Sequence, residues 1–140
     1  MPSPGAETAL HNRILVVEDD QATRNLLTET LLDTGYSVYA VSNEAALLQF
    51  GLVQPDLIIL EILETEPDRW RALHRIRELS SIPIIALVPA ESEGAEVESL
   101  DRGADQYVTK PFGAQEVQAR VQALLRRNQW QRRVSGLNHY

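Results

Sequence analysis

The sequence predicts an α/β fold, a (βα)5 doubly wound sheet of five parallel strands. Two short runs, residues 14–17 and 57–60, are apolar without polar alternation, which is typical of strands buried on both faces of a sheet. Segments with apolar residues at helical spacing follow each of them. Strands that alternate with helices in this way favour parallel pairing with right-handed crossovers.

Composition and charge narrow the functional classes. The chain has 140 residues, 44% of them hydrophobic and 24% charged, which is ordinary for one globular domain. Its net charge of −7 argues against nucleic-acid binding by this segment itself, because phosphate contacts need a basic face. The absence of cysteine excludes disulfides and thiol chemistry. No apolar run reaches membrane-spanning length and no signal peptide opens the chain, so we expect a cytoplasmic protein without membrane contact.

The expected elements alternate along the chain. Residues 1–12 are expected to form a flexible N-terminal arm, residues 13–127 the domain, and residues 128–140 a C-terminal extension or linker. The strands are expected at 13–17, 36–41, 55–61, 82–88 and 105–109, with helices at 21–34, 43–50, about 70–79, 91–102 and 114–127.

Several side chains indicate how the helices begin, end and pack. Asp20 is a candidate cap for the first helix, and Gly35 and Gly103 follow helix ends. In the helix at 91–102, Val97 and Leu100 are expected to point inward. The arginines of the third helix form a stripe that we interpret as a solvated face rather than a binding patch: Arg69, Arg71, Arg75 and Arg77.

Charged side chains gather where the strands end. Glu18 and Asp19 follow the first strand, Glu61 ends the third and Lys110 follows the last, and in a parallel sheet these ends share one edge, the usual place for a site. Of 13 basic residues, Lys110 is the only lysine, and a compact ammonium suits a carboxylate or phosphoryl oxygen. Singly, Glu61 or Lys110 could be a solvated residue; their convergence favours a site.

Four motifs give the chain a family resemblance. They lie at residues 14–20, 55–61, 83–87 and 103–112, and in this order and spacing residues 12–127 resemble a receiver domain of two-component response regulators. Residues 103–112 and 116–127 are most similar to receivers of the OmpR/PhoB transcription-factor type. The resemblance implies a flavodoxin-like, CheY-like fold. Such receivers usually continue into a winged-helix output domain, so DNA would be reached only through a domain outside this segment.

The resemblance also assigns roles to the site residues. In the family, an aspartate at the position of Glu61 accepts a phosphoryl group from a histidine kinase, and it holds Mg²⁺ together with acids matching Glu18 and Asp19. The lysine matching Lys110, which precedes Pro111, neutralises the phosphoryl oxygens. Glu61 is one methylene longer than aspartate and lies where the phosphoryl group should begin. We therefore expect a weak or lost Mg²⁺ site, a Glu61–Lys110 ion pair without metal, and no enzymatic activity.

The sequence differs from the family pattern in two further places, at a residue of the conformational switch and in the loop after Glu61. Val88 occupies the position of a Thr or Ser whose hydroxyl lets an aromatic residue, here Tyr107, turn inward, and valine has no hydroxyl to donate. The loop after Glu61 carries Thr65 and Arg69 in place of a proline and a glycine. These differences predict an atypical, phosphorylation-independent receiver that works through a kinase, another regulator or an output domain. The alternative is a receiver that still transfers and hydrolyses phosphoryl groups on Glu61.

The resemblance finally implies a self-association surface. OmpR/PhoB-type receivers pair through their fourth helix, last strand and last helix, partly by a basic residue that meets an acid matching Glu116. Here the aligned basic position holds Glu96, and like charges across an interface repel. The remaining residues of that surface are Asp105, Gln106 and Arg120. We expect a monomer or a dimer that uses a different surface.

Overall fold

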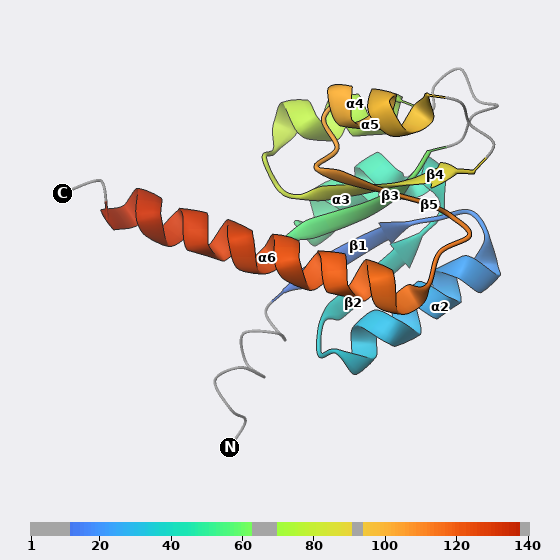
Figure 1. Cartoon of the computed structure of the whole chain (residues 1–140), viewed down its shortest axis with the longest axis horizontal. Coiled ribbons are helices and arrows are strands. Elements are labelled where there is room, and N and C mark those ends of the chain that lie inside the picture. The colour runs from blue at the N-terminus through green and yellow to red at the C-terminus, as the bar shows by residue number, and fades with distance from the viewer. Residues whose placement is uncertain (1–11, 63–69, 91–93, 138–140) are drawn as a thin grey trace.

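The sheet has the predicted architecture. The computed structural model describes residues 12–62, 70–90 and 94–137, and the expected N-terminal arm lies outside them except for Asn12. Five parallel strands stand in the order β2-β1-β3-β4-β5 (Figure 1). Their bounds are close to the expected ones: β1 Arg13–Val17, β2 Ser37–Val41, β3 Leu57–Glu61, β4 Ile84–Pro89 and β5 Gln106–Lys110.

Helices cover both faces of the sheet and enclose two cores. On one face lie α2 (Gln21–Asp33) and α6 (Ala114–Leu137), whose buried residues join Ile14 and Val16 of β1. The other face is covered by α3 (Ala46–Val53), which follows the short 3-10 helix η1 (Asn43–Ala45), and by α4 (Arg71–Leu79) and α5 (Ala95–Asp101). Successive strand residues enter opposite cores, which explains the unbroken apolar runs of β1, β3 and β4. No helix among the described residues has the length and apolar character of a membrane span.

Local signals at the helix ends were predicted correctly. The Asp20 side chain caps α2 by accepting a hydrogen bond from the Thr23 backbone N–H at 2.9 Å. The chain leaves α2 through Gly35, whose φ of 103° suits glycine. In α6 the apolar residues at helical spacing are buried: Val117, Val121, Leu124 and Leu125.

The expected inward face of α5 was wrong. Val97 and Leu100 are 63% and 41% exposed, whereas Ala95 and Ser99 are buried. The small side chains of Ala95 and Ser99 allow the helix to lie close to the sheet. The large apolar residues at helical spacing therefore lie on its outer face. The last helix also differs from expectation, because α6 continues to Leu137 where a linker or frayed extension was expected from residue 128.

The arginine stripe of α4 is not simply a solvated face. Arg77 donates to the backbone oxygens of Gly103 and Ile82, each at 2.8 Å, and it pairs with Asp105 at 2.8 Å. Asp105 in turn accepts from the Ile84 backbone N–H at 2.7 Å. Arg77 thus ties α4 to the starts of β4 and β5. Arg69 lies outside the described residues.

This clamp makes Gly103 sensitive to substitution. A Cβ at Gly103 would lie 2.9 Å from Arg77 Cγ, and its φ of +124° is strained for any other residue. We expect Gly103→Ala to lower the free energy of unfolding by about 1–3 kcal/mol. Gly51 is the matched control: it lies within α3 with open space around it, so Gly51→Ala should raise stability by about 0.5–1 kcal/mol. Urea unfolding measures both, and a neutral Gly103→Ala would contradict the clamp.

Candidate functional site

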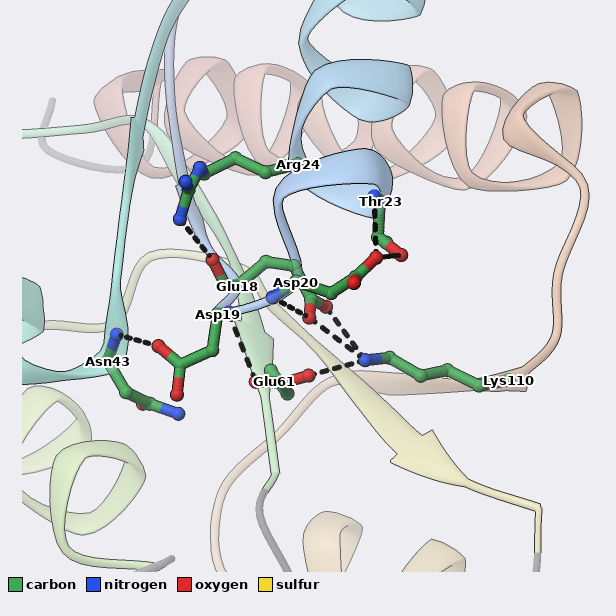
Figure 2. Close-up of polar contacts among 8 residues, drawn as sticks. All are labelled: Glu18, Asp19, Asp20, Thr23, Arg24, Asn43, Glu61 and Lys110. Carbon is green, nitrogen blue, oxygen red and sulfur yellow. Dashed lines mark hydrogen bonds and ion pairs between the residues drawn. The ribbon is translucent and has the colours of Figure 1, made fainter.

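Lys110 bridges two glutamates at the carboxyl edge of the sheet. Its ammonium pairs with Glu61, at the end of β3, and with Glu18, which follows β1 (Figure 2). The Nζ atom lies 3.0 Å from Glu18 Oε1 and 2.9 Å from Oε2. The ion pair expected between Glu61 and Lys110 is therefore present, and Glu18 shares the same cation.

Both carboxylates are held by backbone groups of the loop after β1. Glu18 is fully buried and Glu61 is 7% exposed. The Asp20 N–H donates to Glu18 Oε1 at 3.1 Å, and the Asp19 N–H donates to Glu61 Oε1 at 3.2 Å. Arg24 donates to the Glu18 backbone oxygen at 2.9 Å and fixes the loop from the other side. The longer side chain of Glu61 is thus fixed at both oxygens.

The other two acids of the loop point away from Lys110. Asp19 Oδ1 accepts from the backbone N–H of Asn43 at 2.8 Å, at the start of η1. Asp20 accepts from the backbone N–H and the hydroxyl of Thr23, at 2.9 and 2.6 Å. Three neighbouring acids therefore have three separate partners, as Figure 2 shows. Asn43, Thr23 and Arg24 were not identified from the sequence, because they act mainly through backbone groups that leave no motif.

The two bridged glutamates differ in proton affinity. The pKa of Glu18 is raised to about 7, first by burial and then by the adjacent Glu61, whose effect exceeds the opposing effect of Lys110. Burial also acts to raise the pKa of Glu61, but its interactions with Glu18, Lys110 and the Asp19 N–H together lower it. The pKa of Lys110 is raised, since its two carboxylate partners outweigh its burial. Glu61 and Lys110 are therefore the ionised pair, and Glu18 is the group that takes up a proton near neutral pH.

The acids expected to hold Mg²⁺ do not converge on one point among the described residues. Glu18, Asp19 and Glu61 were expected to hold Mg²⁺, which prefers several oxygen ligands around one point. Among the residues the structure describes, no three acidic or histidine side chains converge on such a point. Asp19 is turned to Asn43, and the Lys110 ammonium lies between the other two.

The expected switch residues lie on β4 and β5, the two strands that follow the strand ending in Glu61 in the sheet. Val88 is fully buried and Tyr107 is half-buried against the same core. Val88 is in register with Thr109 of β5, whose hydroxyl donates to Glu96 of α5 at 3.3 Å. Sequence reasoning missed Thr109, because the register that places it next to Val88 cannot be derived from the sequence.

Pro111 lies at an opening next to the pair. Its peptide bond with Lys110 is cis. Together with residues of α2 and the end of β4, it lines an open cavity of about 450 Å³. The cavity gives solvent access to the Lys110 side of the site.

The expected interface residues have partners within the chain. Arg120 donates to Gln106 at 3.0 Å and to Glu116 at 3.2 Å. Asp105 is held by Arg77. Glu96 accepts from Thr109 and is not brought against Glu116 within the chain.

Comparison with known proteins identifies relatives among transcription regulators. A family model described as the response regulator receiver domain matches residues 14–122. The KDP operon transcriptional regulatory protein KdpE of Escherichia coli is 39% identical over 120 residues, covering 82% of this chain and 52% of that protein. The alkaline phosphatase synthesis regulatory protein PhoP of Bacillus subtilis is 37% identical over 122 residues, covering 86% of this chain and 51% of PhoP. The chain spans about half the length of these curated relatives.

Solved structures agree on the fold. A two-component response regulator from Clostridium difficile superposes with a TM-score of 0.77 at 29% sequence identity. The match covers 84% of this chain and 98% of that one. The predicted flavodoxin-like receiver fold is confirmed.

The raised pKa of Glu18 predicts an unusual pH dependence of stability. Between the ordinary pKa of 4.5 and about 7, the folded state binds a proton that the unfolded state has lost, so the free energy of unfolding falls as pH rises. Glutamine mimics the protonated form. We expect Glu18→Gln to match the parent near pH 5 and to exceed its stability at pH 8, measured by urea unfolding in EDTA.

Glu61→Gln provides the matched control for Glu18→Gln. The pKa of Glu61 is lowered, so its ionised form stabilises the fold above its ordinary pKa. The glutamine variant should lose stability at pH 8 and approach the parent as the pH falls below 4. If Glu18→Gln were instead less stable than the parent at pH 8, Glu18 would be the ionised partner of Lys110 and the assignment would be reversed.

Proposed function

The chain belongs to the response regulator receiver domain family, and we propose that it is an atypical receiver whose signalling does not depend on aspartyl phosphorylation. Receiver domains of transcription regulators interact with histidine kinases and output domains. In this proposal the chain is such an interaction module and not an enzyme. Its partners are a kinase or another regulator and an output domain, through which alone it would act on DNA.

The observation that carries the proposal is the bridge from Lys110 to both glutamates. In the family, the matching lysine meets the oxygens of an incoming phosphoryl group. Here its charge is already balanced by Glu61, whose extra methylene carries the carboxylate to the ammonium. A phosphoryl group would have to displace a buried, charge-assisted contact before it gained one. The position of Glu61 thus supports a site that is complete without modification.

The positions of the acids and the side chain of Val88 support the same proposal. Receiver domains typically bind Mg²⁺ at the phosphorylation site, and the acids within residues 12–62, 70–90 and 94–137 do not converge on one point. A phosphoryl group would also find no hydroxyl on Val88 to draw the end of β4 inward. The position of Asp19, turned to Asn43, and the missing hydroxyl at Val88 therefore support a receiver that does not use the family's phosphoryl switch. We propose that Mg²⁺ binding is weak or lost.

One observation favours the alternative, residual phosphoryl transfer to Glu61. Its pKa is lowered, so Glu61 is an ionised carboxylate and a possible nucleophile. In that reaction a Glu61 oxygen would attack the phosphorus of a donor, and the donor group would depart with the electrons of its bond to phosphorus. Hydrolysis of the resulting acyl phosphate would return the carboxylate and inorganic phosphate.

Small phosphodonors distinguish the two functions. The parent chain, incubated with acetyl phosphate or phosphoramidate and Mg²⁺, should gain no phosphoryl group by intact mass. Glu61→Asp should gain one, because the shorter side chain restores the space for it, and Glu61→Gln should gain none. A parent chain that becomes modified, with the modification lost in Glu61→Gln, would establish the alternative.

A second experiment separates the effect of Glu61 from that of Val88. We expect Glu61→Asp alone to restore phosphorylation without moving Tyr107, since a ligand shifts an equilibrium only through differential contacts with its two states. The double change Glu61→Asp with Val88→Thr should also alter amide exchange in α5 and β5 when beryllofluoride, a phosphoryl mimic, is added. A full response of Glu61→Asp alone would show that Val88 is a tolerated packing substitution.

A further inference from the structure

The outer face of α3 is apolar. The exposed positions of this helix are 47, 48, 51 and 52, and they hold three leucines and one glycine. Leu48 and Leu52 are 66% and 68% exposed, and Leu47 is 40% exposed. A helix on the surface of a globular domain normally carries polar or charged side chains on its outer face. The solvent-facing side of α3 therefore has the composition of a contact surface.

This face carries no charge. Residues 45–55 include no acidic or basic residue, although 24% of the whole chain is charged. Among the α-helices that the structure describes, α3 alone has no charged side chain. A partner with a charged surface would lose hydration on this face without gaining an ion pair. The surface that suits it is apolar and uncharged, as the face of α3 itself is.

Large and small side chains are arranged symmetrically on this face. The middle of α3 lies between residues 49 and 50, and Leu47 and Leu52 are equally far from it. Leu48 and Gly51 are also equally far from it. In an antiparallel pair of α3 helices with a two-fold axis at this middle, Leu48 of each copy lies opposite Gly51 of the other. Leu47 lies opposite Leu52 in the same way, so the face is complementary to itself.

Gly51 leaves room for a second copy to approach closely. A Cβ at this position would meet no atom within 4 Å, and Gly51 is not among the glycines with positive φ. Neither packing within the chain nor backbone conformation therefore requires glycine here. Glycine inside a helix is unfavourable relative to alanine, so its presence in the short helix α3 needs another reason. The Leu48 side chain of a second copy would fill the space above it.

We propose that two copies of the chain form a dimer by antiparallel pairing of the outer faces of α3. Leu48 of each copy occupies the space above Gly51 of the other. Because the net charge of each chain is −7, two copies repel each other, and an uncharged face is the favourable place for them to meet. The contact includes no residue of α5, β5 or α6 and none of the Glu61–Lys110 site, so it does not depend on the outcome of the phosphorylation experiments.

Sedimentation of the complete 140-residue chain tests the proposal. The contact is smaller than a stable interface of roughly 800 Å² per partner, so the dimer should be reversible, with a dissociation constant of roughly micromolar to millimolar. Salt should strengthen the dimer or leave it unchanged. The reason is that salt screens the repulsion between the two chains, and the apolar contact has no ion pair to lose.

Truncation of one leucine should weaken the dimer. Leu48→Ala should raise the dissociation constant at least about tenfold, since the two-fold axis repeats the lost contact in both halves of the interface. Leu32→Ala is the matched control, because Leu32 is 51% exposed and belongs to α2, which covers the other face of the sheet. It should leave the dimer unchanged.

A mixture of two variants tests the register of the pair. Gly51→Leu should keep the fold, because open space surrounds Gly51, and should weaken the dimer, because two leucines would then compete for one space. An equal mixture of Leu48→Ala and Gly51→Leu should restore dimerisation, since each leucine at these positions then faces a small residue.

Several results would overturn the proposal. They are a chain that stays monomeric up to millimolar concentration, a Leu48→Ala variant that dimerises like the parent, and a mixture that dimerises no better than the single variants. A dimer that Arg120→Ala abolishes and Leu48→Ala leaves intact would lie on the surface used by OmpR/PhoB-type receivers, which also contradicts pairing through α3.

Discussion

The interaction on which the site depends is the sharing of one ammonium by two buried carboxylates. Burying Glu18 and Glu61 together would be strongly unfavourable without a cation, since each loses hydration and each repels the other. Lys110 supplies the cation from the end of β5, and backbone N–H groups of residues 19 and 20 satisfy further oxygens. The ends of three strands are thereby fixed relative to one another. The ion pairs of Lys110 with Glu18 and Glu61 therefore fix the conformation of the loop after β1, the orientation of Glu61 and the position of Lys110.

This charge balance also explains why a single methylene matters. An aspartate at the end of β3 would be one methylene shorter, so on the same backbone its carboxylate would lie farther from the Lys110 ammonium than that of Glu61 does. Glutamate reaches the ammonium with its own carboxylate, so the cation is satisfied in the unmodified chain. Because the Glu61 carboxylate already balances the charge of Lys110, a negatively charged phosphoryl group would gain little binding free energy there. The longer side chain is therefore better understood as part of a closed site than as an impaired nucleophile.

Much of the fold and part of the site could be predicted from the sequence. The apolar runs of β1, β3 and β4 fixed the sheet, and parallel topology brought Glu18, Glu61 and Lys110 to one edge. The roles of Arg77 and Thr109 were not predictable, because they depend on backbone oxygens and cross-strand neighbours far away in sequence. The inner face of α5 was missed for a related reason, since periodicity identifies large apolar residues and cannot show that a helix packs through small ones.

The closed site changes what positions α5. In a receiver that responds to phosphate, the end of β4 transmits the state of the site to this helix. Here Val88 has no hydroxyl for that role, and α5 is held by burial of Ala95 and Ser99 and by the Glu96–Thr109 hydrogen bond. Under the proposed function, a partner that binds the outer face of α5 would select the conformation that phosphorylation selects in other receivers.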